Sequence, residues 1–218
     1  PLSDCVQLFE GDEDRILCLN PDYVGWKLKS ADYEGIPHLK GIFTESTGYE
    51  WVEQEAANKL NIPICNIVQF NNESVAEWAI MIMLNLARQT PRIIKDGFPL
   101  DFDKDFMKYR GVQLVGKTAG IIGLGHIGSA IAERCKGLGM NVVYWSRSST
   151  NDAYTKLPLD ELLATADVIF PATAKNEETT SLVNDDMIRS IKKEAMVVEI
   201  VHTMFNHDFL LDLVKIGI

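Results

Sequence analysis

The strongest constraint on this chain is a glycine-rich turn between two apolar segments. Residues 119–122 form a short apolar run, and Gly123, Gly125 and Gly128 follow it with the spacing G-x-G-x-x-G. An amphipathic segment then leads to a second apolar run at residues 142–145. This order predicts a strand, a helix and a second strand, with the glycines at the first turn.

A turn of this kind suits a dinucleotide because each glycine has its own task. The first permits a tight turn, the second lets a pyrophosphate approach the backbone, and the third lets the helix pack closely on the strand. Free amides at the start of the helix then meet the phosphates. The alternative is that the glycines only tighten a flavodoxin-like turn. We expect dinucleotide binding, by Gly123, Leu124, Gly125, His126, Ile127 and Gly128.

Composition narrows the class of partner and the cellular compartment. A net charge of −10 argues against a nucleic-acid surface, which needs a basic face, so we expect a small-molecule ligand. No apolar run approaches the length of a membrane span, and no signal-peptide pattern opens the sequence. Four scattered cysteines without C-x-x-C spacing indicate reduced, structural thiols, and no metal-ligand cluster is visible. We therefore expect a cytoplasmic protein without a membrane partner.

The rest of the chain alternates between strand-like and helix-like segments. Before residue 72, apolar runs at 15–19, 41–43 and 64–68 predict the parallel strands of a smaller α/β unit, with a helix at 51–60 between them. Beyond Ser148 the alternation continues to the end of the sequence, which predicts a doubly wound parallel sheet. We expect two domains, residues 1–72 and 73–218, with residues 91–111 as a connecting segment on the surface.

One helix is apolar around almost its whole circumference. Ser74 is its expected N-cap, Glu77 would complete a capping box, and residues 78–87 are nearly all apolar. A helix without a polar face must be covered on all sides. We expect the protein's own sheet to cover part of it and a second subunit the rest, giving a homodimer through the Ser74–Arg88 helix.

The order of motifs resembles that of the NAD(P)-dependent D-2-hydroxyacid dehydrogenase family, and the glyoxylate/hydroxypyruvate reductases in particular. The resemblance rests on L-K-G-I-F-T-E-S-T-G-Y-E, S-V-A-E-W-A, L-V-G-K-T-A-G-I-I-G-L-G-H-I-G, L-D-E-L-L-A-T-A-D-V-I and E-E-T-T-S-L-V-N. It implies a Rossmann domain with a smaller flavodoxin-like substrate domain. It also implies hydride transfer between a nicotinamide cofactor and a small 2-hydroxy or 2-oxo acid.

The resemblance also implies roles for individual residues. Ser46, Thr47 and Gly48 match the loop that holds the substrate carboxylate. His202 stands where the family has its carboxylate-binding arginine, and a protonated histidine there can still hold an acid. The family's catalytic histidine and glutamate would lie beyond residue 218, so we expect a C-terminally truncated, inactive fragment with both domains incomplete. The alternative is a naturally shortened relative that cannot run the reaction unaided. His38 and His207 have no predicted partner. Further cofactor contacts are implied for Asn72, Ala172, Thr173, Thr179, Ile200 and Val201.

The end of the second strand predicts which dinucleotide binds. NAD enzymes place a carboxylate there to accept hydrogen bonds from the ribose 2′-hydroxyl. Ser146 occupies that position, and no acidic residue occurs between Glu133 and Asp152. Arg147, flanked by Ser146 and Ser148, suits the 2′-phosphate of NADP, so we expect NADP in preference to NAD. The alternative is a solvated surface arginine.

A second function remains open from the sequence. A non-catalytic dinucleotide sensor, similar to the corepressor branch of the same family, would keep the glycine turn without needing a catalytic arginine. His202 in the arginine's place favours this alternative slightly.

Overall fold

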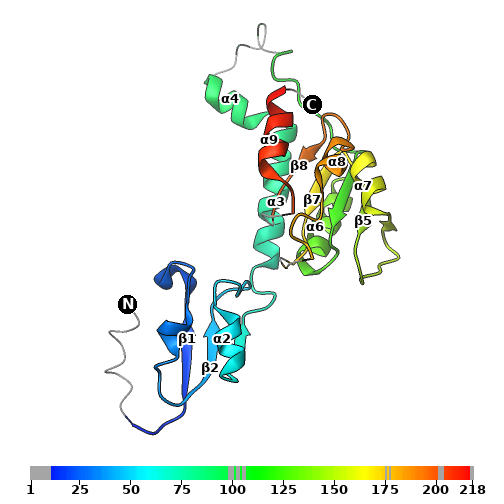
Figure 1. Cartoon of the computed structure of the whole chain (residues 1–218). Helices are drawn as coiled ribbons and strands as arrows, with labels where there is room; N and C mark the ends of the chain where they lie inside the picture. Colours follow the sequence, from blue (N-terminus) through cyan, green and yellow to red (C-terminus); the bar gives the residue numbers. More distant parts are fainter. Residues whose placement is uncertain are drawn as a thin grey trace. The chain divides into compact units, whose positions relative to one another are not determined.

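The computed structural model describes residues 11–97, 101, 104, 107–174, 176, 178–200 and 204–216. The chain divides between Asn71 and Asn72 into two compact units, residues 1–71 and 72–218, one residue before the expected boundary. Each unit has its own parallel sheet and its own buried core (Figure 1). In the part of the chain that the structure describes, no helix is long and apolar enough to cross a membrane.

The first unit is a small α/β layer. Its sheet has the order β1 (Arg15–Leu19), β2 (Leu39–Thr44), β3 (Ile64–Asn66), with all three strands parallel. One face is buried against the segments that carry η2 (Pro21–Val24), α1 (Ser30–Tyr33) and α2 (Gln54–Lys59). Cys18 and Cys65, which we expected among core runs, are exposed. The role of this unit as a substrate domain stays a prediction.

The helix expected at 51–60 is shorter than its sequence suggests. It begins at Gln54, because the backbone just before it forms hydrogen bonds with a different segment of the chain. The Leu28 amide donates to the Trp51 carbonyl at 2.9 Å, and the Glu53 amide donates to the Leu28 carbonyl at 2.9 Å. These two bonds form a short parallel bridge between Leu28 and Val52, and the side chains of Trp51 and Val52 are both buried in the core.

The second unit is a doubly wound parallel sheet, as predicted. Its five strands run in the order β6-β5-β4-β7-β8, all parallel. The chain proceeds outward from β4 on one side, returns, and proceeds outward on the other side. This is the common Rossmann order, in which successive strands are added first on one side of the first strand and then on its other side. The strands are β4 (Thr118–Ile122), β5 (Asn141–Trp145), β6 (Thr155–Lys156), β7 (Val168–Pro171) and β8 (Met196–Val197).

Helices cover both faces of this sheet. Ile121 packs into a core with α3 (Asn72–Ala87) and α6 (His126–Gly137), whereas the adjacent Ile122 packs into a second core with α7 (Leu159–Thr165) and α8 (Asp185–Arg189). Successive side chains of a strand point to opposite faces, so β4 is buried on both sides. α9 (His207–Ile216) follows β8. The carboxyl end of β4 leads into the glycine turn, and this end of the strands is where doubly wound sheets bind ligands.

Two local predictions in this unit are wrong. Ser74 is not an N-cap, because α3 already begins at Asn72 and includes Ser74. Residues 91–111 are not only a connection, because their first part belongs to α4 (Thr90–Asp96). Gln89 has a left-handed φ of 55°, which ends the α3 run, and Pro91 then stands in the first turn of α4, a position that suits proline. Tyr109 Oη donates to Asp96 at 2.6 Å and ties the segment back to this helix.

Candidate functional site

The glycine turn lies between the end of β4 and the start of α6. Gly123 has φ +100°, and a Cβ there would lie 2.8 Å from the backbone nitrogen of Thr173. A Cβ on Gly128 would lie 2.0 Å from the carbonyl oxygen of Gly123. Both positions thus require glycine for the packing of the protein itself, the first for the turn and the second for the approach of helix to strand.

Gly125 differs from its two neighbours. It is exposed, and a Cβ at this position would meet nothing within 4 Å. It is the N-cap of α6, a helix of 12 residues, so unpaired amides of the first helical turn point to the same open space. Packing does not explain this glycine, whereas close approach of a pyrophosphate to the backbone does.

A buried hydroxyl beside the turn also lacks a partner. Thr173 Oγ1 is inaccessible to solvent and forms no hydrogen bond with any described residue. Buried polar atoms are normally hydrogen-bonded, so an orphan next to a glycine turn indicates a place for a ligand group. Together with the open face of Gly125, it shows that these residues fit a dinucleotide. The Leu124 side chain is buried in the core, which leaves only its backbone for such a ligand; His126 is exposed and Ile127 half-buried.

The loop after β5 carries the residues expected to recognise the ribose. Ser146 Oγ accepts a hydrogen bond from the Ser149 amide at 3.1 Å and thereby shapes the loop. Arg147 forms an ion pair with Glu178, and both side chains are exposed. Glu178 was not predicted, because no local motif links two residues that meet only through the order of the strands. Ser148 is exposed beside them.

The loop after β7 lies on the other side of β4. The Ala172 amide donates to the Ile122 carbonyl at 2.8 Å, which continues the sheet pairing into this loop. Thr179 is buried, and its hydroxyl donates to the Ala174 carbonyl at 2.7 Å and accepts from the Asn176 amide at 2.9 Å. Thr179 therefore stabilises the shape of the loop, and its contact with a ribose stays a prediction.

The segment after β8 contains a pair of a histidine and a glutamate that the sequence did not suggest. His207 Nε2 lies 2.8 Å and 2.7 Å from the two carboxylate oxygens of Glu199, a partner that the sequence did not identify. His38 likewise lies 3.7 Å from an oxygen of Asp12. Ile200 is half-buried against the core of the sheet. Val201 and His202 lie outside the described residues.

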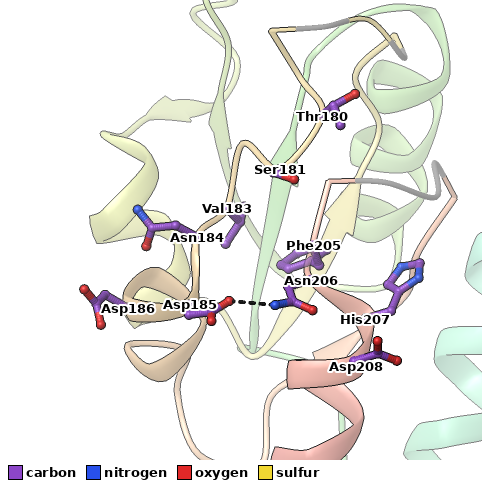
Figure 2. A pocket seen from close by; sticks show the side chains of 10 residues that line it. All are labelled: Thr180, Ser181, Val183, Asn184, Asp185, Asp186, Phe205, Asn206, His207 and Asp208. Carbon is purple, nitrogen blue, oxygen red and sulfur yellow. Dashed lines mark hydrogen bonds between the residues drawn. The ribbon is translucent and has the colours of Figure 1, made fainter.

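A separate hollow of about 850 Å³ lies between the segment before α8 and the start of α9. Figure 2 shows it, with Asn206 Nδ2 donating to Asp185 Oδ1 at 3.1 Å. Asp186 and Asp208 make its lining acidic. None of the predicted cofactor residues lines it, and within the described ranges no three histidine, cysteine, aspartate or glutamate side chains converge as metal ligands. The hollow is therefore distinct from the predicted dinucleotide site at the carboxyl end of β4.

The loop predicted to hold a carboxylate lies in the first unit, directly after β2. Ser46 Oγ donates to the Gly48 carbonyl at 2.6 Å, and the Trp51 indole nitrogen donates to the same carbonyl at 3.0 Å. Asn66 Nδ2 donates to the Thr47 carbonyl at 2.7 Å. The loop carbonyls are thus engaged, whereas the amides of Thr47 and Gly48 donate to no other described residue.

Asn72, the last predicted cofactor contact, is the first residue of α3 and is half-buried. It opens the second unit, whereas the carboxylate loop belongs to the first.

Comparison with known proteins identifies an NAD-binding domain in the second unit. Residues 80–213 match a family model described as "D-isomer specific 2-hydroxyacid dehydrogenase, NAD binding domain". The chain is 30% identical over 181 residues to a glyoxylate reductase of Pyrococcus horikoshii, covering 77% of the chain and 53% of that enzyme. It is 33% identical over 180 residues to a D-3-phosphoglycerate dehydrogenase of Archaeoglobus fulgidus, covering 79% of the chain and 33% of that enzyme.

Solved structures give the same answer for the fold. The crystal structure of the TT0316 protein from Thermus thermophilus superposes with a TM-score of 0.82 at 26% identity, covering 99% of this chain and 68% of that one. The chain spans about half the length of the glyoxylate reductases that it matches, 53% in the case of the Pyrococcus horikoshii enzyme.

Proposed function

The chain belongs to the D-isomer specific 2-hydroxyacid dehydrogenase family, and from this membership we propose that it takes part in hydride transfer between NADP(H) and a small 2-hydroxy or 2-oxo acid. Gly125 carries the proposal, because it is the glycine that the packing of the protein does not require and it faces open space at the start of α6. When bound, the nicotinamide supplies or accepts the hydride.

The residues of the second unit would divide the work of holding the dinucleotide. The amides of the first α6 turn, beyond Gly125, would bind the pyrophosphate through the positive end of the helix. The orphaned Thr173 hydroxyl would bond the part of the cofactor that lies beside the Gly123 turn. Arg147, between two serine hydroxyls, would bind a 2′-phosphate, since a guanidinium pairs well with phosphate oxygens.

The acid substrate would be held by the first unit. The amides of Thr47 and Gly48, which donate to no other described residue, suit a carboxylate. His202 would supply a positive charge if protonated, at the position where the resemblance places an arginine. The proton that accompanies the hydride needs a donor with a pKa near the working pH.

Two measurements on the full-length protein test the proposal. Dissociation constants for NADPH and NADH, followed by titration calorimetry, test the cofactor, and we expect tighter binding of NADPH. Oxidation of NADPH with glyoxylate, hydroxypyruvate and pyruvate, followed at the nicotinamide absorbance band, tests the reaction. Binding without turnover of any 2-oxo acid would support the second candidate, a non-catalytic dinucleotide sensor, which the histidine at position 202 favours.

We also propose that the protein is a homodimer through the exposed face of α3. Ala76, Ala79 and Met83 on the opposite face are fully buried in the protein's own core, whereas Trp78, Met81 and Leu84 are exposed. They adjoin an apolar groove of about 610 Å³ between α3 and α6, which a second copy of the helix would fill.

The dimer is tested by the oligomeric state in solution. Light scattering after gel filtration should give twice the chain mass for the native protein and the single mass for Met81→Glu. Exposed Met107→Glu, in the 107–110 segment, is the matched control and should leave the mass unchanged. A native protein with the single mass would refute the dimer.

A further inference from the structure

We propose that Glu178 selects the cofactor, by pairing with Arg147 when no 2′-phosphate is present and by competing with that phosphate for the guanidinium. This inference rests on the dinucleotide site proposed above. It concerns a residue that touches the recognition arginine from the opposite loop, and it makes the preference for NADP or NAD a property of the pair and not of Arg147 alone.

The strand order places this pair over the glycine turn. β5 and β7 are the two neighbours of β4 in the sheet, so the loops that follow them flank the loop that follows β4. Arg147 comes two residues after β5, and Glu178 lies in the loop after β7. The ion pair therefore joins the loops on the two sides of β4, the strand whose turn carries Gly125. In doubly wound sheets a dinucleotide binds across this position.

Hydrogen bonds link the described residues that lie near Glu178 in sequence. The Thr179 amide donates to Asn176 Oδ1 at 3.0 Å, and the Asn176 amide donates to Thr179 Oγ1 at 2.9 Å. Thr173, at the start of the loop, packs against Gly123. Glu178 thus directly precedes Thr179, a buried residue whose hydroxyl donates to the Ala174 carbonyl of the same loop. The Glu178 carboxylate pairs with Arg147 from this position.

Charge determines how the pair responds to each cofactor. NAD presents a neutral 2′-hydroxyl, which has no advantage over a carboxylate as a partner for a guanidinium. NADP presents a phosphate with more negative charge and more acceptor oxygens, and it takes the guanidinium from Glu178. The released carboxylate then lies near that phosphate and repels it. Glu178 therefore weakens NADP binding and leaves NAD binding almost unchanged.

Solvent keeps the pair easy to open. The Arg147 side chain is 52% exposed and the Glu178 side chain 74% exposed, so water screens their attraction. Exposed ion pairs are weak, so we expect removal of the Glu178 charge to tighten NADPH binding by about fivefold. The Arg147–Glu178 ion pair, which we call the latch, is thus weak. A weak pair suits a site that must exchange its cofactor in every turnover.

The test is a set of dissociation constants for NADPH and NADH, measured by calorimetry on the full-length protein. Glu178→Gln should tighten NADPH binding by about fivefold and change NADH binding by less than about twofold. Arg147→Gln should weaken NADPH binding, and adding Glu178→Gln to it should restore little. Glu161→Gln removes the same charge from an exposed position on α7 and should change neither constant.

The outcomes separate the latch from the proposed function. An unchanged ratio of the two constants in Glu178→Gln would overturn the latch, as would an equal effect of this substitution with and without Arg147. If the native protein prefers NADH but Glu178→Gln moves the ratio toward NADPH, the NADP preference is wrong and the latch is supported. If the native protein binds neither dinucleotide, both the proposed site and the latch are refuted.

Discussion

The two edges of the five-stranded sheet are built for different purposes. At the carboxyl edge, Gly125 is uncovered and the Thr173 hydroxyl has no described partner. At the amino edge, Asp167 before β7 accepts a hydrogen bond from the Thr118 amide at 2.8 Å and pairs with Lys192 at 2.7 Å. One edge leaves hydrogen-bonding capacity for a ligand, and the other uses its capacity to join neighbouring strands. Substitutions at the first should change binding, and substitutions at the second should change stability.

Gly128→Ala should be an exception, because it should lower the free energy of unfolding although it lies at the carboxyl edge. This is the largest effect that we expect. It lies at the binding edge, yet its Cβ would be 2.0 Å from the Gly123 carbonyl oxygen, so helix and strand must separate. Overpacking of this kind costs about 3 kcal/mol in the free energy of unfolding. Urea denaturation followed by circular dichroism measures the loss.

Gly137→Ala is the matched control for this substitution. It is the last residue of the same helix, and its Cβ would meet nothing within 4 Å. We expect its unfolding midpoint to equal or slightly exceed that of the native protein, since alanine favours helix over glycine. If Gly128→Ala unfolds at the same urea concentration as Gly137→Ala, close packing is not the reason for the third glycine.

Asp167→Ala tests the amino edge, where a substitution should change stability and leave binding unchanged. The side chain is 16% exposed, and its removal leaves the Thr118 amide and Lys192 without their shared acceptor. Losing a hydrogen-bonded charge costs about 2 kcal/mol of unfolding free energy. Binding of NADPH should stay within about twofold of the native value, because the change lies at the opposite end of the strands. A large loss of affinity in a variant that remains folded would contradict the separation of the two edges.

The same carboxylate should also give the stability a pH dependence. Burial by itself raises the pKa of Asp167, but the hydrogen bonds from Lys192 and the Thr118 amide outweigh it, and the folded-state pKa is lowered. The carboxylate therefore stabilises the fold above its unfolded pKa of about 4, and this contribution disappears as the pH falls through the folded-state value. The difference in unfolding free energy between native protein and Asp167→Ala should shrink between neutral pH and pH 3. A constant difference would show that packing, and not charge, is what Asp167 contributes.

Features encoded by neighbouring residues were predictable from the sequence, and features that depend on strand order were not. The apolar runs and the glycine spacing predicted the strands β1, β4, β5 and β7 and the helix after the turn. The bridge between Leu28 and Val52 shortens a helix that the sequence of residues 51–60 by itself favours.

The charged pairs show the same limit at the site. Arg147 was found because it follows a strand directly, but its partner Glu178 belongs to a loop on the far side of β4. Asp167 and Thr118 likewise meet because β7 lies beside β4. Without the strand order, neither contact can be inferred from the residues that make it.

Gly125→Ala gives the smallest change in stability and the cleanest test of the binding edge. Its φ of −86° is open to alanine, and the new methyl group meets nothing within 4 Å, so the free energy of unfolding should change by less than about 0.5 kcal/mol. The methyl group would nevertheless occupy the space through which a pyrophosphate approaches the backbone. We expect NADPH and NADH to bind about tenfold more weakly, since a lost or lengthened charge-assisted hydrogen bond costs about that factor. Calorimetry on a variant with an unchanged unfolding midpoint measures this loss separately from stability. Native affinity in Gly125→Ala would mean that the dinucleotide does not lie on this turn, and that the open space above Gly125 has another cause.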